Sequence, residues 1–160
     1  MPQRFTEFLG SKDVVLPLVA KDKWEAIDAL MAHVAARHGM ASSEAGARRE
    51  LVLARERSMP TGMERGNATP HAAVDGLDRP VGALGFVKDP AGLPFDSIDA
   101  QPTNFVVLLL IPRDQKLQHI RTLADIARLL SRDDVRKGLL ESEDGAEAWR
   151  VVDCAEVENR

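Results

Sequence analysis

The sequence predicts an α/β fold in which a single central mixed β-sheet is flanked by helices on both faces. Apolar residues recur at helical spacing near both ends of the chain. The middle of the chain instead contains short apolar runs bounded by turn residues, which is typical of strands. One of these runs, 105–111, is apolar at every position, as expected of a central strand that is covered on both faces.

The N-terminal segments are expected to form a short strand and a helix. Residues 14–19 are mostly apolar, but Pro17 cannot donate a hydrogen bond to a neighbouring strand, so this segment is an edge strand at best. Apolar side chains then recur at helical spacing from Trp24 to Val34. Gly39 follows them and is the expected C-cap, because glycine adopts left-handed backbone angles easily.

A second helix and two further strands are expected before the central strand. Ser42 or Ser43 can cap this helix, which continues to about residue 57. The first of the two strands is 72–74, and the second is 81–87, with a glycine-containing turn between them.

Helical periodicity returns after the central strand. Asp114 is the expected N-cap of a long helix, and residues 131–134 resemble a capping box for a short helix through Leu140. The apolar positions assigned to one face of the long helix are Leu117, Ile120, Leu123, Ile126, Ala127 and Leu130. Residues 146–160 can be assigned neither to helix nor to coil. Two helices on each face of the sheet would explain why the central strand is apolar throughout.

Composition indicates one domain spanning 1–160, with a core of about 12–145. The chain is 44% hydrophobic and 29% charged, which argues against disorder. Its net charge of −4 gives no electrostatic reason to expect binding to nucleic acid or to an anionic membrane. The longest apolar run is too short to span a bilayer, so we expect a cytoplasmic protein without membrane insertion.

Cysteine and histidine usage gives no indication of a metal or another cofactor. Cys154 is the only cysteine, which excludes an internal disulfide and a cysteine-based zinc site. The four histidines are scattered along the chain without the spacing of metal ligands. We therefore expect neither a metal nor a cofactor.

The most informative segment is a turn-rich loop that ends in a histidine. Residues 61–71 read TGMERGNATPH, with two glycines and a proline in the loop and His71 where a strand-like stretch begins. An imidazole can act as a nucleophile, an acid or a ligand, because its reference pKa lies near neutrality. A second histidine, His119, lies near the start of the long helix.

These segments together resemble the enzyme IIA domain of the bacterial phosphotransferase system, in its fructose/mannitol and nitrogen-regulatory branch. The family shows an Arg-Glu pair before a loop of the type TGIGNGVAIPH, and here Arg55-Glu56 precedes the loop 61–71. An aspartate and Gln-Pro precede an apolar strand in the family, as in residues 99–102 before 105–112. His119-Ile120 resembles the histidine that opens the next helix.

The resemblance implies a phosphocarrier with a phosphohistidine intermediate. His71 would accept a phosphoryl group from an HPr-like protein, and His119 would stabilise that group. Thr61 and Arg55 are candidates for binding the phosphoryl oxygens. From the residues alone, Thr61 needs no role beyond its turn, and Arg55 can simply complement the dipole of its helix.

Three functional alternatives remain open. A single domain without an attached transporter favours the nitrogen-regulatory type, in which the phosphorylation state is read by a regulated kinase or transporter. A sugar-specific enzyme IIA that donates to an enzyme IIB is the second alternative. The third is a protein-binding module without phosphoryl chemistry, because Glu64 and Asn67 depart from the family's loop and the Glu64 carboxylate would repel a phosphoryl group.

Overall fold

The structure is a computed structural model that describes residues 7, 9–62, 66–89, 91–95 and 101–158. Its strands are β1 (Val14–Val15), β2 (Asn67–Ala68), β3 (His71–Val74), β4 (Val81–Phe86) and β5 (Phe105–Pro112). Its helices are α1 (Lys23–Arg37), α2 (Ser42–Ser58), α3 (Lys116–Leu130), α4 (Asp133–Glu141) and α5 (Gly145–Glu158). Two short 3-10 turns are η2 (Ser11–Asp13) and η4 (Arg113–Gln115).

The five strands form one mixed sheet, which confirms the predicted fold class. The order is β1-β4-β5-β2, and β3 also pairs with β5. β4 and β5 are antiparallel, whereas β1 is parallel to β4 and both β2 and β3 are parallel to β5. β1 is an edge strand, as expected, and it covers only two residues of the segment 14–19.

β2 and β3 lie along the same side of β5 in one continuous register. Asn67 pairs with Phe105, and four residues further along both strands His71 pairs with Leu109. The pairing is interrupted only between β2 and β3, at Thr69 and Pro70. β2 lies in the segment predicted to be a loop, because two residues that include an asparagine carry no strand signal of their own.

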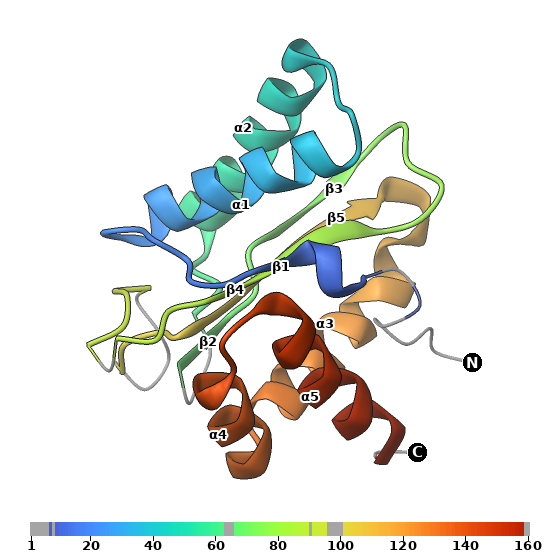
Figure 1. Ribbon diagram of the computed structural model, residues 1–160. Helices are drawn as coiled ribbons and strands as arrows, with labels where there is room; N and C mark the ends of the chain where they lie inside the picture. The colour runs from blue at the N-terminus through green and yellow to red at the C-terminus, as the bar shows by residue number, and fades with distance from the viewer. Residues whose placement is uncertain (1–6, 8, 63–65, 90, 96–100, 159–160) are drawn as a thin grey trace.

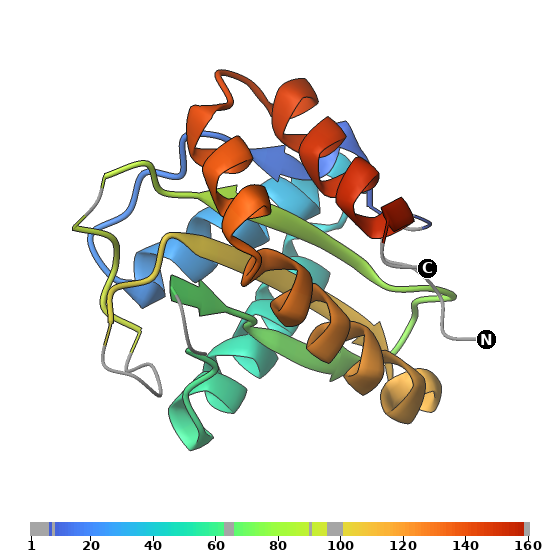
Figure 2. The ribbon, with the colours of Figure 1, turned by 90° about the horizontal axis from the view of Figure 1, so that it is seen from below.

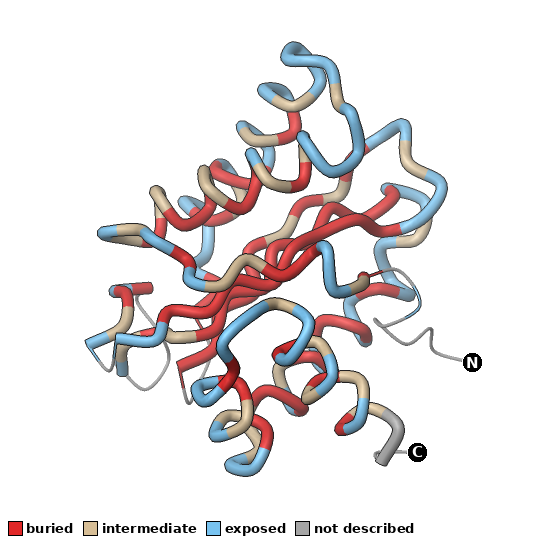
Figure 3. The backbone as a smooth tube through the Cα atoms, in the orientation of Figure 1, coloured by how far each residue is buried: buried red, intermediate tan, exposed pale blue. Residues whose placement is uncertain are grey.

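β5 is buried along its whole length between two hydrophobic clusters (Figures 1 and 3). Successive strand residues point to opposite faces of a sheet, so the apolar run supplies both clusters. The side chains packed with α1 and α2 are those of Val106, Leu108 and Leu110. Those packed with α3, α4 and α5 are Phe105, Val107, Leu109 and Ile111. The central strand is therefore covered on both faces, as predicted.

The helices are distributed unequally over the two faces. Figure 1 shows α1 and α2 on one face and α3, α4 and α5 on the other, and Figure 2 shows the second group from its own side. The prediction of two helices on each face is wrong, because the unassigned C-terminal segment forms α5. Ala148, Val152 and Ala155 of α5 are buried in the second cluster.

One predicted helix cap is confirmed. Gly39 has a φ of 62°, and the amide of Met40 donates to the carbonyl of Ala35, which is the 6→1 hydrogen bond of a Schellman motif. At the other end of α1, the side chain of Asp22 accepts a hydrogen bond from the amide of Glu25.

The other predicted caps are wrong. Ser42 and Ser43 lie inside α2, whose N-cap is Ala41. Asp114 lies within η4, and α3 begins after Gln115. α4 begins after Arg132 without a side-chain cap, so the expected capping box does not form.

The apolar face predicted for α3 is only partly buried. Leu117 and Ile120 are exposed by 84% and 47%, whereas Leu123, Ile126, Leu129 and Leu130 are buried. An α-helix turns about 100° per residue, so positions spaced by three drift about 60° around the helix at each step. Leu117 and Ile126 are three such steps apart and therefore point in opposite directions. Within the part of the chain that is described, no helix is long and apolar enough to cross a membrane.

Candidate functional site

His71 is the first residue of β3, on the edge of the sheet. Ala72 and Val74 point into the cluster under α1 and α2. Strand alternation therefore directs the half-buried side chain of His71 to the opposite face, which is the face that α3 covers. The register with Leu109 fixes this orientation, because a slip by one residue would turn His71 to the other face.

The imidazole of His71 is held by one main-chain contact. Its Nδ1 lies 2.8 Å from the carbonyl oxygen of Thr69. A carbonyl oxygen only accepts, so Nδ1 carries the proton, and in the neutral ring the lone pair is on Nε2. Burial lowers the pKa of His71 below its ordinary value, although the hydrogen bond to Thr69 acts in the opposite direction. The ring is therefore a neutral imidazole at neutral pH, with Nε2 as its nucleophilic nitrogen.

Three charged side chains act on this imidazole. Arg55 and Lys116 lower the pKa of His71 and Glu56 raises it, all as smaller effects than burial. Arg55 and Glu56 come from the last turns of α2, and Lys116 is the first residue of α3. The Nη1 of Arg55 donates to the carbonyl of Met59 at 2.8 Å. His71 thus lies where the end of one helix and the start of another bring two cations towards the same edge of the sheet.

His119 is fully buried in the first turns of α3. Its Nε2 lies 3.0 Å from Oε1 of Gln115, whose amide nitrogen donates to the carbonyl of Asp78. Burial lowers the pKa of His119. Both histidines belong to the same sheet face, since α3 covers the face to which His71 points. Because the Gln115 oxygen only accepts, Nε2 of His119 carries the proton and donates it to Gln115. His119 would have to exchange this contact in order to donate to a phosphoryl group.

Thr61 is buried and already hydrogen-bonded. Its hydroxyl donates to Oε1 of Glu56 at 2.5 Å, and its amide donates to Oε2 of the same carboxylate at 2.8 Å. The predicted contact of this hydroxyl with phosphoryl oxygens stays a prediction. In this structure the single hydroxyl proton of Thr61 is used in the hydrogen bond to Glu56.

Asn67, one of the residues that depart from the family's loop, has a structural role. Its side-chain amide donates to Ser131 Oγ at 2.9 Å and to the carbonyl of Ala127 at 3.3 Å. The residue is completely buried, and Arg136 of α4 donates to its Oδ1. Asn67 therefore ties β2 to the end of α3. Glu64, another of these departures, lies outside the described residues, as does Asp99 of the second family feature.

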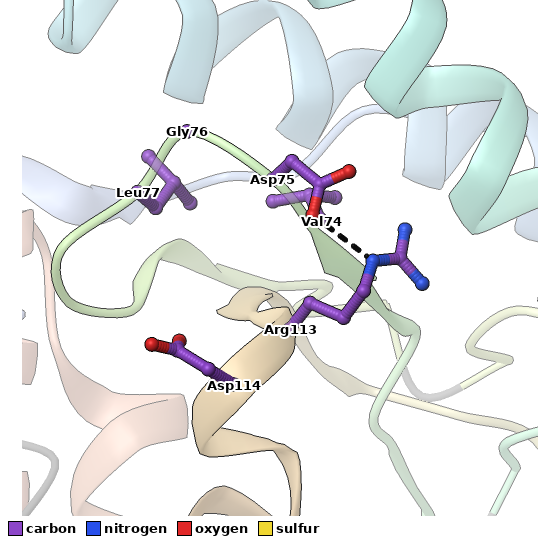
Figure 4. A pocket seen from close by; sticks show the side chains of 6 residues that line it. All are labelled: Val74, Asp75, Gly76, Leu77, Arg113 and Asp114. Carbon is purple, nitrogen blue, oxygen red and sulfur yellow. Dashed lines mark hydrogen bonds and ion pairs between the residues drawn. The ribbon is translucent and has the colours of Figure 1, made fainter.

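A surface pocket is lined by residues at and beyond the C-terminal end of β3 (Figure 4). His71 is at the opposite end of this strand. Its charged rim contains Arg113, which donates to Asp75 at 3.1 Å and to the carbonyl of Ala73 at 3.3 Å. The pair is well exposed, so it contributes little to stability. None of the predicted site residues lines this pocket. Among the described residues, no group of His, Cys, Asp and Glu side chains could hold a metal ion.

The chain matches one known protein family over most of its length. Residues 7–154 match the family described as "Phosphoenolpyruvate-dependent sugar phosphotransferase system, EIIA 2". The chain belongs to this enzyme IIA family. The match spans all five strands and most of the helices, so the enzyme IIA resemblance expected from the loop, the Arg-Glu pair and His119 is confirmed.

Enzyme IIA proteins of two kinds are similar to this chain. A "Nitrogen regulatory protein" of Bradyrhizobium diazoefficiens is 31% identical over 147 residues, which cover 92% of this chain and 93% of the relative. The "PTS system fructose-specific EIIABC component" of Bacillus subtilis is also 31% identical, over 140 residues, but these are 88% of this chain and only 21% of the relative. This chain thus spans about a fifth of the fructose-specific protein's length.

A solved enzyme IIA structure shares the fold. "Nitrogen Regulatory Protein IIA-Ntr" from Neisseria meningitidis superposes with a TM-score of 0.80 at 22% identity, covering 92% of this chain and 98% of that one.

Three residues that contact or act on the two histidines were not predicted from the sequence. Glu56 entered only as half of the Arg-Glu pair, although it accepts both hydrogen bonds of Thr61. Gln115 lies four residues before His119, a spacing that could have indicated a side-chain pair on a helix. Nothing in the sequence indicates that Lys116 acts on His71, because only the fold brings the start of α3 close to β3.

Proposed function

We infer that the protein is a phosphocarrier in which Nε2 of His71 accepts a phosphoryl group from the phosphohistidine of an HPr-like protein. The observation that carries this inference is the contact between Nδ1 and the Thr69 carbonyl, which leaves the Nε2 lone pair available on a neutral ring. The donor's N–P bond breaks as the Nε2–P bond forms, so the donor imidazole is released. The Nδ1 proton stays on His71, where the Thr69 carbonyl stabilises the cationic phosphoimidazole ring.

The surroundings of His71 suit an incoming phosphoryl group. Phosphoryl transfer depends mainly on positioning and on stabilising negative charge. Arg55 and Lys116 supply positive charge from two helices, and both lie close enough to affect the pKa of His71. We assign Arg55 to attracting the phosphoryl oxygens and His119 to contacting them from the same sheet face.

Exposed apolar side chains accompany these cations and suit a protein partner. Met59 follows α2 and is 61% exposed, while Leu117 and Ile120 are exposed on the first turns of α3. Each is close in sequence to a residue of the proposed site: Arg55, Lys116 or His119. Large exposed apolar residues beside a functional site are common at protein interfaces. Met59, Leu117 and Ile120 together are called the apolar rim. We propose the apolar rim as the contact surface for the HPr-like donor and for the downstream acceptor.

Similarity to the nitrogen regulatory relative supports the regulatory type. In that type, the phosphorylation state of His71 is read by a regulated kinase or transporter in the cytoplasm. The fructose-specific relative supports the alternative, an enzyme IIA that donates to an enzyme IIB during sugar uptake. The hypothesis of a binding module without phosphoryl chemistry has less support, because the departure at Asn67 is explained by its contact between β2 and α3.

The test is incubation with phosphoenolpyruvate, enzyme I and an HPr-like protein, followed by intact mass. We expect an acid-labile gain of one phosphoryl group in the wild type and in the control His38→Ala, because His38 is exposed at the end of α1. His71→Ala should gain nothing. A folded wild-type protein that gains no mass, or a His71→Ala variant that still gains it, would overturn the proposed function.

A further inference from the structure

A buried carboxylate closes the start of the loop that leads to His71. Glu56 is 1% exposed and accepts hydrogen bonds from both the amide and the hydroxyl of Thr61. Its Oε2 also lies 3.5 Å from Nζ of Lys23, which is itself buried. An ionised carboxylate suits this site, because it accepts at both oxygens and has no proton to place.

Thr61 is connected to His71 through the main chain. The amide of Thr69 donates to the carbonyl of Thr61 at 3.2 Å, and Gly62 forms an antiparallel bridge with Ala68. The two ends of the loop are therefore paired with each other. The carbonyl of the same Thr69 accepts from Nδ1 of His71. A displacement of Thr61 thus moves the group that holds the imidazole.

The other side of this segment is fixed by β5. The amide of Leu109 donates to the carbonyl of Pro70 at 3.0 Å, and the amide of Asn104 donates to the carbonyl of Gly66 at 2.9 Å. Residues 66–71 consequently lie between two supports. One is the sheet, and the other is the Glu56–Thr61 contact.

We propose that Glu56 is a positioning residue which, through Thr61 and Thr69, holds His71 in the tautomer with its lone pair on Nε2. The role rests on the proposed function of His71 as phosphoryl acceptor. Glu56 does not touch the phosphoryl group. If the support is lost, the Thr69 carbonyl shifts, the ring populates its other tautomer, and Nε2 then carries a proton that blocks attack.

This role differs measurably from a role of Thr61 as a phosphate ligand. A phosphate ligand affects only the phosphorylated protein and the transfer step. A support for the loop affects the imidazole of the resting protein, before any phosphoryl group is present. The two roles therefore separate in the unphosphorylated state.

The main experiment compares Thr61→Val with Thr61→Ser in nitrogen-15-labelled, unphosphorylated protein. Valine keeps the shape of threonine and removes the hydroxyl donor, whereas serine keeps that donor. Long-range proton–nitrogen spectra, recorded well above the ordinary histidine pKa, report which ring nitrogen of His71 is protonated. We expect the Nδ1–H tautomer alone in the wild type and in Thr61→Ser, and a mixture of both tautomers in Thr61→Val.

Phosphoryl-transfer rates complete the comparison. Thr61→Val should slow phosphorylation by an HPr-like donor by roughly tenfold or more, and Thr61→Ser should restore it. A wild-type tautomer in Thr61→Val, with a change only in the lifetime of the phosphorylated form, would overturn the positioning role in favour of a phosphate ligand.

A double variant keeps the inference testable if Thr61→Val does not fold. Glu56→Gln alone would deprive the buried Lys23 of its carboxylate partner, which is strongly destabilising. Lys23→Met combined with Glu56→Gln removes both charges together. We expect this double variant to fold and to show the mixed tautomers. Retention of the single Nδ1–H tautomer there would also contradict the proposal.

The tautomer measurement separates this inference from the proposed function. If the variants shift the tautomer but the wild type takes up no phosphoryl group, the carrier function fails and the positioning role of Glu56 stands. If the wild type is phosphorylated on His71 but no variant shifts the tautomer, the positioning role fails alone.

Discussion

At the scale of single residues, the proposed phosphoryl chemistry depends on His71 being neutral. Burial lowers its pKa below the ordinary value of 6.5, so the protonated form is reached only at lower pH. Because neutral His71 is the nucleophile, the rate of phosphoryl acceptance should fall to half at a pH below 6.5. A histidine of ordinary pKa would already be half protonated at 6.5. Nuclear magnetic resonance titration of the His71 ring measures this directly, and a midpoint at or above 6.5 would contradict the account.

The sequence indicates His71 and His119 as candidate site residues, but it does not indicate their contacts. The residue types, the glycine-containing loop and the family resemblance all indicated an imidazole site. The partner of each ring could not be predicted in the same way. The Thr69 carbonyl reaches His71 only because β2 and β3 share one register along β5. Thr61 shows the same limit, since its hydroxyl looks available in the sequence and is bonded to Glu56 in the fold.

At the scale of elements, two glycines of β4 allow close packing on the sheet. A Cβ at Gly82 would collide with the main-chain oxygen of Leu108 in the neighbouring strand. A Cβ at Gly85 would meet side-chain atoms and no main chain, at 2.7 Å from Leu18 and 3.1 Å from Leu30. Gly82→Ala should therefore destabilise the fold by about 3 kcal/mol and Gly85→Ala by about 1 kcal/mol.

Denaturant unfolding of the two glycine variants checks this order. The midpoint should fall further for Gly82→Ala than for Gly85→Ala, with an unchanged slope. Equal losses, or a larger loss at Gly85, would show that the backbone contact between β4 and β5 is more yielding than the structure indicates.

Elements with a strong apolar pattern were predicted well, and element ends were not. β4 and β5 were found because long apolar runs between turn residues have few alternatives. The serine and aspartate caps failed because a cap requires a specific backbone geometry as well as a suitable side chain. The prediction from the apolar spacing of α3 is wrong at Leu117. Positions spaced by three drift around the helix, so this predicted core residue points towards solvent.

At the scale of the whole molecule, we expect the exposed apolar rim to be the surface that contacts protein partners. Leu117→Asp should leave the fold intact, since this side chain is 84% exposed, and an acidic residue suits the first turn of a helix. It should slow phosphorylation by an HPr-like donor by about tenfold, equivalent to ~1.4 kcal/mol of binding.

The matched control is Leu140→Asp on α4, another exposed leucine, which should transfer at the wild-type rate. Rates are measured at donor concentrations below saturation. If both variants transfer as fast as the wild type, the rim around Leu117 is not the contact surface.

The fold of the whole chain was predictable because its layers follow from one strand that is apolar on both faces. The enzyme IIA family is shown by the match over residues 7–154, which extends far beyond the loop. The unassigned C-terminal segment forms α5, which packs against β1 and α4. These contacts could not be predicted from the local sequence pattern.

The central claim is that Nε2 of His71 carries the phosphoryl group. The most direct measurement is a nitrogen-15 and phosphorus-31 spectrum of the labelled protein after phosphorylation by enzyme I and an HPr-like donor. The account predicts a phosphorus–nitrogen coupling at Nε2 of His71, with the proton retained on Nδ1. A coupling at Nδ1, a coupling at another histidine, or the absence of phosphohistidine in a folded protein would contradict it.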